Sequence, residues 1–171
     1  MAENKKTIEV KVEVKELMYD AMNKTFLTGQ ARKAEAQDQN YQAASNMQAS
    51  EDNENSYQLR RSLTNAFTAL KSLLGEYLDE DKTTANNRIP ALVDEDGQLT
   101  LAFSLPSNFN NASVDSLGAG IHAYITDMMI GEWFTITNKA DAADYINHAN
   151  ISLETVKRAL YKRSRPVRPV Y

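Results

Sequence analysis

Residues 59–78 read LRRSLTNAFTALKSLLGEYL, and their apolar side chains recur at intervals of three and four. This spacing places them on one face of an α-helix, and the basic residues Arg60, Arg61 and Lys71 fall off that face. We therefore predict a long amphipathic helix over about residues 54–78 whose apolar face packs into a core. That face consists of Leu59, Leu63, Ala66, Phe67, Leu70, Leu73, Leu74, Tyr77 and Leu78.

Three further segments show helical spacing, over about residues 16–28, 112–133 and 138–162. Gly29 follows the first of them and is either a stop or a kink. Asn138 opens the last one, with Asp141 at the spacing of a capping box.

The helix predicted over residues 112–133 contains the small residues Gly118, Ala119 and Gly120 near its start. A glycine in a helix interior costs about 1 kcal/mol relative to alanine. We expect a closely packed neighbouring helix to compensate for this cost.

Two segments have the alternation of β-strands. Ile8, Val10, Val12 and Val14 alternate with charged residues, which predicts a strand with one buried and one exposed face. A second alternation follows an acidic turn at residues 94–97, so residues 89–105 predict a hairpin. The first strand pairs either with this hairpin or with another molecule, because an isolated strand leaves its backbone polar groups unsatisfied. Its four apolar residues are therefore candidate interface residues.

The stretch from residue 31 to residue 55 is rich in Gln, Asn, Ala, Glu and Ser. Alanine and glutamine favour a helix, but few large apolar side chains here could anchor one to a core. It is either a weakly packed helix or a mobile excursion.

The resulting fold class is mainly α, or α+β: a bundle of about four helices with a small antiparallel β element. We expect one domain over residues 1–163, followed by an extended basic tail over residues 164–171. The chain has no cysteine, no apolar leader and no apolar run long enough to span a bilayer, so neither secretion nor membrane insertion is expected.

No motif in the sequence assembles an active site. His122 and His148 fall on different predicted helices without metal-ligand spacing, and they are either ligands or ordinary structural histidines. The acidic clusters at residues 79–81 and 94–96 lack the spacing of a calcium loop and fit solvated turns. Phosphate-binding loops and serine-nucleophile motifs are absent as well. We expect no catalytic residue, no metal and no cofactor.

The C-terminus differs from the rest of the chain in charge. Residues 157–171, KRALYKRSRPVRPVY, carry six of the nineteen Lys and Arg residues and no acid, whereas residues 1–156 carry thirteen bases against twenty-three acids. Such a segment is a frayed end, an arm that contacts phosphates without base specificity, or an extended ligand for an acidic protein surface. The candidate partner-binding residues are Lys162, Arg163, Arg165, Pro166, Arg168, Pro169 and Tyr171.

Trp133 and Phe134 follow Met128, Met129 and Ile130 by one helical turn and form the densest apolar patch of the chain. This patch is either part of the core or an oligomer interface, where aromatic and methionine residues are enriched. Trp133 and Phe134 are therefore candidate interface residues too.

Residues 105–166 carry a family resemblance. The run contains LPSNF at 105–109, EWF at 132–134, NKAD at 138–141 and RALYKRSRP at 158–166. It resembles the small head-tail connector proteins of tailed bacteriophages and prophages, especially those of Bacteroidetes, including crAss-like phages. The similarity covers roughly residues 100–166, and none of its motifs is catalytic.

The resemblance implies a non-enzymatic virion protein: a subunit of a homo-oligomeric neck ring, commonly twelvefold, that joins the portal to the tail. It implies contacts with portal, neck and tail proteins, and a location in the virion neck after assembly in the host cytoplasm. DNA would pass through such a ring without sequence-specific binding, and no membrane is involved. The alternative is a nucleic-acid-binding or packaging-associated protein that uses the basic tail on phosphates.

Overall fold

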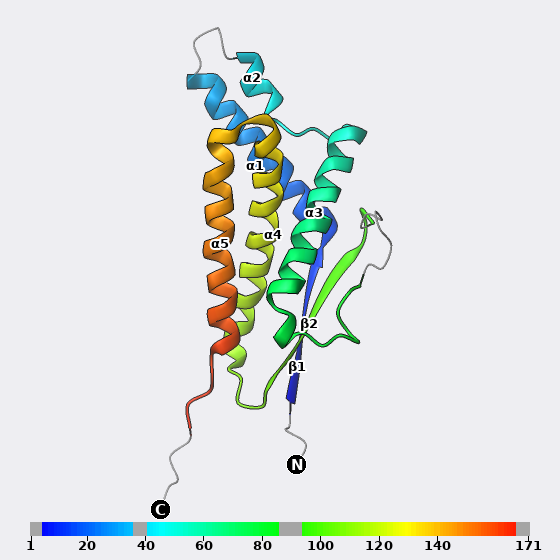
Figure 1. Cartoon of the computed structure of the whole chain (residues 1–171), viewed down its shortest axis with the longest axis vertical. Helices are drawn as coiled ribbons and strands as arrows, with labels where there is room; N and C mark the ends of the chain where they lie inside the picture. The colour runs from blue at the N-terminus through cyan, green and yellow to red at the C-terminus, as the bar shows by residue number, and fades with distance from the viewer. Residues whose placement is uncertain (1–4, 36–40, 86–93, 167–171) are drawn as a thin grey trace, which may run out of the picture.

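The computed structural model describes residues 5–35, 41–85 and 94–166 (Figure 1). Its elements are two strands, five α-helices and two short 3₁₀ turns within these residues. In chain order they are β1 (Lys5–Glu13), α1 (Val14–Glu35), α2 (Tyr41–Asn46), α3 (Asn53–Leu73), the turn Gly75–Tyr77, β2 (Gln98–Pro106), the turn Asn111–Ser113, α4 (Val114–Thr137) and α5 (Lys139–Tyr161). The predicted fold class, a helical bundle with a small antiparallel β element, is confirmed.

The bundle is arranged around α4, which packs against α5, α3, α1 and β1. α4 and α5 lie side by side as an antiparallel pair, and β1 continues directly into α1 (Figure 1). β1 begins and α5 ends at the same end of the molecule.

The sheet consists of β1 and β2, paired antiparallel from Lys5 opposite Pro106 to Glu13 opposite Gln98. The strand predicted at the N-terminus therefore finds its partner within the chain. β2 is the second half of the predicted hairpin, and residues 89–93 of its first half lie outside the described residues. Val14, predicted in the strand, is instead the first residue of α1.

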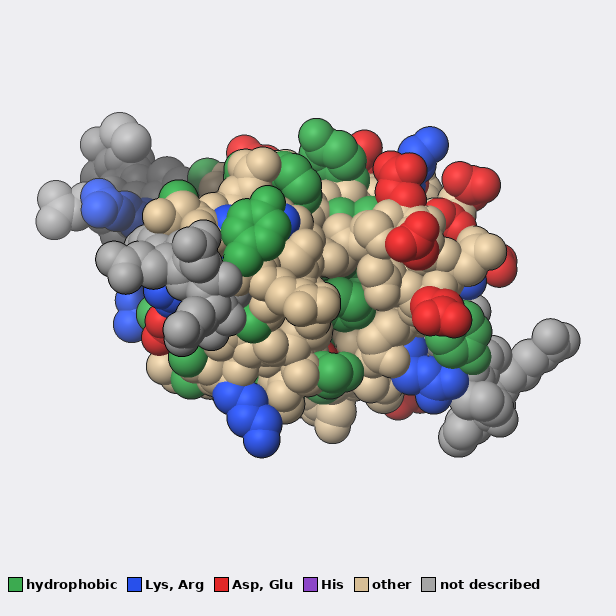
Figure 2. All heavy atoms as spheres, turned by 90° about the horizontal axis from the view of Figure 1, so that it is seen from above, with side chains coloured by type: hydrophobic (Ala, Val, Ile, Leu, Met, Phe, Trp, Pro, Cys, Tyr) green, Lys and Arg blue, Asp and Glu red, His purple; other side chains and the backbone are tan. Residues whose placement is uncertain are grey.

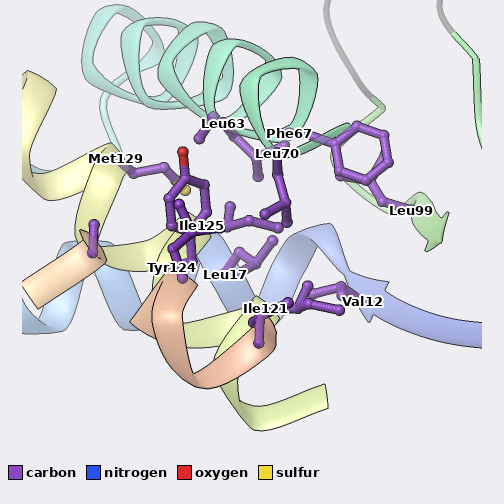
Figure 3. Close-up of a cluster of buried hydrophobic side chains, with 14 of the residues drawn as sticks. Val12, Leu17, Leu63, Phe67, Leu70, Leu99, Ile121, Tyr124, Ile125 and Met129 are labelled. Atoms are coloured by element: carbon purple, nitrogen blue, oxygen red, sulfur yellow. The ribbon is translucent and has the colours of Figure 1, made fainter. Parts of the chain in front are cut away.

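The core lies where the sheet meets α1, α3 and α4. In Figure 3, Val12 of β1 lies beside Ile121 of α4, and Leu99 of β2 lies beside Phe67 of α3; all four belong to one buried cluster. Each fully buried large apolar side chain contributes about 1.5–3 kcal/mol relative to exposure, so this cluster is the main source of stability.

α1 is longer than predicted, and it passes through Gly29 without ending there. Gly29 is buried because α2 and the residues after it pack against it: a Cβ at this position would lie 2.5 Å from Cγ of Gln48 and 3.0 Å from the backbone oxygen of Ala44. The glycine therefore serves close packing.

The polar stretch over residues 31–55 is more ordered than a mobile excursion where it is described. It contains the end of α1, the short helix α2 and the start of α3, and it buries Ala44, Met47 and Ala49. Residues 36–40 within it lie outside the described residues.

α3 ends at Leu73, earlier than predicted, and the chain continues into the 3₁₀ turn at Gly75–Tyr77. Leu59, Leu63, Phe67 and Leu70 are buried as expected, but Leu73 is 49% exposed. Leu74, just past the end of the helix, is fully buried, so Leu73 lies at the margin of the apolar face.

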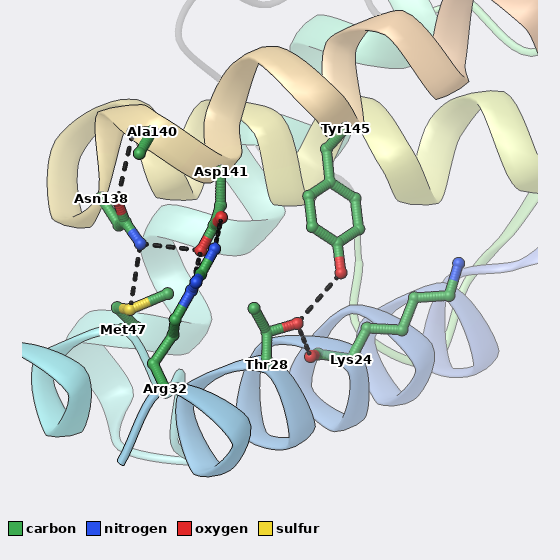
Figure 4. Close-up of polar contacts among 8 residues, drawn as sticks. All are labelled: Lys24, Thr28, Arg32, Met47, Asn138, Ala140, Asp141 and Tyr145. Atoms are coloured by element: carbon green, nitrogen blue, oxygen red, sulfur yellow. Dashed lines mark hydrogen bonds and ion pairs between the residues drawn. The ribbon is translucent and has the colours of Figure 1, made fainter. Parts of the chain in front are cut away.

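The predicted close approach of helices is confirmed at Gly120, where a Cβ would lie 2.8 Å from Cγ2 of Val156 on α5. The predicted cap is also present, since the Asn138 side chain accepts a 3.1 Å hydrogen bond from the Ala140 amide. Asp141, however, accepts hydrogen bonds from the side chains of Asn138 and Arg32 (Figure 4). It thus joins α5 to α1.

Candidate protein-binding surfaces

The basic C-terminal segment leaves the bundle at Tyr161, where α5 ends, and continues in an extended conformation at Lys162. Its first residues are held against the segment that follows β2. The Asn110 amide donates to the Lys162 oxygen at 3.2 Å, and the Ser164 amide donates to the Asn108 oxygen at 2.8 Å. Arg163, half-buried between them, forms an isolated β-bridge with Phe109.

The segment becomes free of the bundle after Ser164, one residue later than the predicted boundary. Arg165 and Pro166 are exposed and run beyond the end of the helices (Figure 1). Arg168, Pro169 and Tyr171, the remaining predicted partner-binding residues, lie outside the described residues. The described bases Lys162, Arg163 and Arg165 therefore lie together at this end.

The apolar side chains of β1, predicted as candidate interface residues, face the chain's own core. Val10, Val12 and Val14 are buried in the chain's own core, and Ile8 packs against it. Their partner is the β2 and α4 side of the same molecule, which the alternation in the sequence could not identify.

The core interpretation of the aromatic patch is confirmed for Trp133 and Phe134, and an interface on another face of the patch stays a prediction. Trp133 is 7% exposed and Phe134 is fully buried. The Phe134 ring packs edge to face on Tyr145 of α5 at 5.4 Å between centroids, and the Trp133 indole donates to the Met47 oxygen.

The edge of β1 that faces away from β2 is nevertheless open for backbone hydrogen bonds. Thr100 and Ala102 of β2 use their backbone groups on the side away from β1: the Thr84 amide donates to the Thr100 oxygen, and the Asp79 amide donates to the Ala102 oxygen. The amides of Thr100 and Ala102 donate in turn to the hydroxyls of Thr84 and Thr83. The outer edge of β2 is thus covered by residues 79–84.

The ladder geometry then fixes the orientation of β1. Opposed residues in an antiparallel pair exchange both hydrogen bonds or neither. Since Thr100 and Ala102 face away from β1, their partners Lys11 and Glu9 direct their own N–H and C=O groups away from β2. The same period of two applies to Thr7 and to the N–H of Glu13, whose C=O is used by the first turn of α1. Among the described residues, no backbone hydrogen bond from outside the sheet reaches these groups.

A groove of about 420 Å³ lies between this open edge and α4. Its lining includes Lys11, Glu13, Glu16, Gly118, Ala119 and His122. Gly118 and Ala119 have no side chain larger than a methyl group, so α4 leaves space next to β1. An extended segment fits between the strand and the helix. His122 is half-exposed, and its Nε2 lies 2.7 Å from Oδ2 of Asp20 on α1.

The charge around the groove is mostly negative. Glu9, Glu13 and Glu16 are exposed, and Asp20 is half-buried next to them in the chain. Lys11 is the basic residue in the groove lining. A basic extended segment would therefore find complementary charge here.

A group of exposed carboxylates lies at the end of the molecule opposite the C-terminal segment. Glu51, Asp52 and Glu54 are exposed at the start of α3. In Figure 2, the view from above, Asp and Glu side chains gather on one side of this end. The basic C-terminal segment leaves from the opposite end (Figure 1).

The groups singled out for chemistry do not converge within the described residues. His122 lies on α4 and pairs with Asp20, whereas His148 is exposed on α5 with its ring 6.2 Å from that of Tyr145. The acidic clusters at residues 79–81 and 94–96 lie on the surface. In the part of the chain that the structure describes, no three His, Asp or Glu side chains are grouped so that they could hold a metal ion.

No family model, no curated protein and no solved structure matches the chain. Across the described ranges, no helix combines the length and apolar character needed to cross a membrane.

Proposed function

We propose that the chain is a structural subunit of a phage neck ring, a head-tail connector that joins the portal to the tail. In this proposal it assembles in the host cytoplasm, remains in the virion, and binds its neighbours through its basic C-terminal segment. The observation that carries the proposal is the path of residues 162–166. Backbone hydrogen bonds of Lys162 and Ser164 hold the start of this segment to the bundle. The chain then extends past the end of the bundle, where the Arg165 side chain is exposed.

The distribution of charge supports head-to-tail contact. Exposed carboxylates at the start of α3 lie at one end of the molecule, and the basic segment projects from the other end. Contacts between different surfaces of successive copies generate rings when the rotation between copies closes. Each contact is then repeated around the ring, so an arm with modest affinity gains strength from its repetition.

A structural role also fits the use that the chain makes of its polar groups. Asp141 and Asn138 tie α5 to α1 and to the end of α2, and Asp127 pairs with Lys24 at 3.3 Å (Figure 4 shows the first of these contacts). These contacts hold helices together. Arg32, which donates to Asp141, also lines a groove of about 430 Å³ on α1.

Removal of residues 165–171 tests the proposal. The truncated chain should keep the helical circular dichroism of the full chain but lose most of its assembly, measured by mass photometry alone and with candidate portal and tail proteins. A matched variant that keeps the length, Arg165→Gln with Arg168→Gln, separates charge from contact area. Neutralising two exposed bases elsewhere, Lys15→Gln with Lys139→Gln, is the control and should assemble normally. Normal assembly of the truncated chain would contradict the proposal.

The second candidate function is nucleic-acid binding. It is favoured by one observation: Lys5 and Lys6 begin β1 at the same end at which Lys162, Arg163 and Arg165 leave α5. Such a cluster would bind phosphates, and its affinity would fall steeply as salt rises. Filter binding of duplex DNA across a salt series tests this function, and no retention at low salt would rule it out.

A further inference from the structure

We propose that the open edge of β1 receives the arm of a second copy of this chain, residues 165–171, as a third strand of the sheet. The inference rests on the proposed function, and it assigns the surface on which the arm docks. Strand addition to an exposed sheet edge is a common mode of peptide recognition, in which backbone hydrogen bonds supply affinity and side-chain pockets supply specificity.

The backbone groups of the edge and the arm match over most of their length. Thr7, Glu9 and Lys11 direct their N–H and C=O groups outward from β1, and Glu13 directs its N–H outward. The C=O of Glu13 is used by α1, which begins at the next residue. The arm reads RPVRPVY, and its alternate residues 165, 167, 169 and 171 supply four carbonyls for the four edge amides. The amides of residues 167 and 171 pair with the carbonyls of Lys11 and Thr7, whereas Pro169 has no N–H for Glu9. The arm can therefore make six of the eight hydrogen bonds of a full ladder with this edge.

Pro166 suits an edge strand, whereas Pro169 costs the ladder one hydrogen bond. When residues 165, 167, 169 and 171 pair with β1, the backbone of Pro166 faces away from β1. No partner strand is present on that side, so the missing N–H of Pro166 costs no hydrogen bond. It also removes a donor from the newly formed edge, so that a further strand cannot add easily.

Charge favours an antiparallel register. Arg165 then lies opposite Glu13, and Tyr171 lies opposite Thr7. Arg165 meets the part of the groove that Glu13 and Glu16 line, and an arginine-carboxylate pair is among the stronger side-chain contacts.

Length and direction point to a neighbouring copy. Seven residues of extended chain span about 23 Å, and the edge from Thr7 to Glu13 also has seven residues. Arg165 and Pro166 run past the end of their own bundle, away from their own β1 (Figure 1). The contact is therefore made between copies, with different surfaces on the two sides.

A charge exchange tests the register. Glu13→Lys and Arg165→Glu should each weaken self-association of the full chain about tenfold, a loss of about 1.4 kcal/mol. The double variant in one chain should restore it, because every contact then has its opposite charges again. Sedimentation velocity measures association, and urea unfolding of each variant checks that the subunit stays folded.

Cross-linking tests the location independently of charge. The chain has no cysteine, so Thr7→Cys in one copy and Tyr171→Cys in another give a unique pair of thiols. A mixture of the two single variants should form a cross-linked dimer with a short bis-maleimide reagent. The control replaces Thr7→Cys with Glu154→Cys, an exposed position on α5, and should give only background.

The outcomes separate this inference from the proposed function. If removal of residues 165–171 abolishes assembly, but the double variant is no better than the single variants and no specific cross-link forms, the arm docks elsewhere and only the inference fails. A full chain that remains monomeric at its highest soluble concentration overturns the inference as well. If removal of the arm leaves assembly intact, the proposed function itself fails.

Discussion

The indole Nε1 of Trp133 donates a 2.8 Å hydrogen bond to the backbone oxygen of Met47, and this bond joins the end of α2 to α4. Both residues are buried, and Sδ of Met47 also accepts a hydrogen bond from the Asn138 side chain. An isolated helix as short as α2 is not stable in water. Its position therefore depends on this contact and on the close packing at Gly29.

Replacing Trp133 by alanine should destabilise the isolated subunit by about 3–5 kcal/mol, because the change leaves a large cavity and an unpaired carbonyl oxygen. The control is Ile136→Ala on the same helix, where the side chain is 70% exposed and the loss should be below about 0.5 kcal/mol. Urea unfolding of both variants measures the difference. Equal stability of the two variants would show that Trp133 is not part of the subunit core.

Gly118 and Gly120 flank Ala119 on α4. Replacing each of them by alanine should change the stability of the subunit in opposite directions. A Cβ at residue 120 would lie 2.8 Å from Cγ2 of Val156, so Gly120→Ala forces α5 to shift and should cost about 1–3 kcal/mol. At residue 118 the nearest atom is Cγ1 of Val10 at 4.0 Å, so Gly118→Ala should stabilise by up to about 1 kcal/mol through helix propensity. Thermal melts compare them. Stabilisation by both changes would contradict the close packing of α4 and α5.

The sequence was sufficient to predict elements whose pattern is local. The alternation over Ile8–Val12 located β1, the apolar stripe over Leu59–Leu70 located α3, and Asn138 located the start of α5. In these places one residue pattern decides the geometry. The element bounds differ where a distant segment intervenes, as at Gly29, which continues a helix because Ala44 and Gln48 pack over it.

The candidate site could be predicted only in part. Composition identified the basic tail, but the pinning of Lys162 and Ser164 depends on the loop at Asn108 and Asn110. The open edge of β1 could not be found from its own residues, because which edge is open depends on the coverage of β2 by Thr83 and Thr84. The same dependence explains why the sequence left the partner of β1 open between this chain and another molecule.

Asp141 accepts hydrogen bonds from Nε of Arg32 at 3.1 Å and from Nδ2 of Asn138 at 2.8 Å, and it is 7% exposed. Asp141→Asn removes the charge and places an amide donor against two donors, so it should cost about 1–3 kcal/mol. Asp144→Asn, at an exposed position in the next turn of α5, is the control and should change stability little. Urea unfolding at neutral pH is the measurement. A loss shared equally by both variants would mean that the Arg32 contact adds nothing specific.

Burial raises the pKa of the Tyr124 phenol above its ordinary value of 10.0. Its folded pKa is therefore higher than its unfolded pKa, and the stability that it contributes is present below about pH 10 and is lost as pH rises through the folded pKa. Tyr124→Phe should resemble the unaltered chain at neutral pH and lose less stability above about pH 10. Tyr19→Phe, at a position 65% exposed, is the control. Identical alkaline unfolding of the two variants would contradict the effect of burial.

Two truncations should separate the pinned part of the C-terminal segment from the free arm. A chain ending at Ser164 keeps the hydrogen bonds from the Asn110 amide to Lys162 and from the Ser164 amide to Asn108, so its unfolding free energy should stay within about 0.5 kcal/mol of the full chain. A chain ending at Tyr161 loses both bonds and exposes the ring of Phe109, which is 1% exposed in the full chain. Because a backbone hydrogen bond contributes about 0.5–1.5 kcal/mol and the ring loses cover, it should be less stable by about 2–4 kcal/mol. Urea unfolding of both chains measures this. A marked loss already in the longer truncation would place the arm in the fold of the subunit, and its role as a free docking segment would then be untenable.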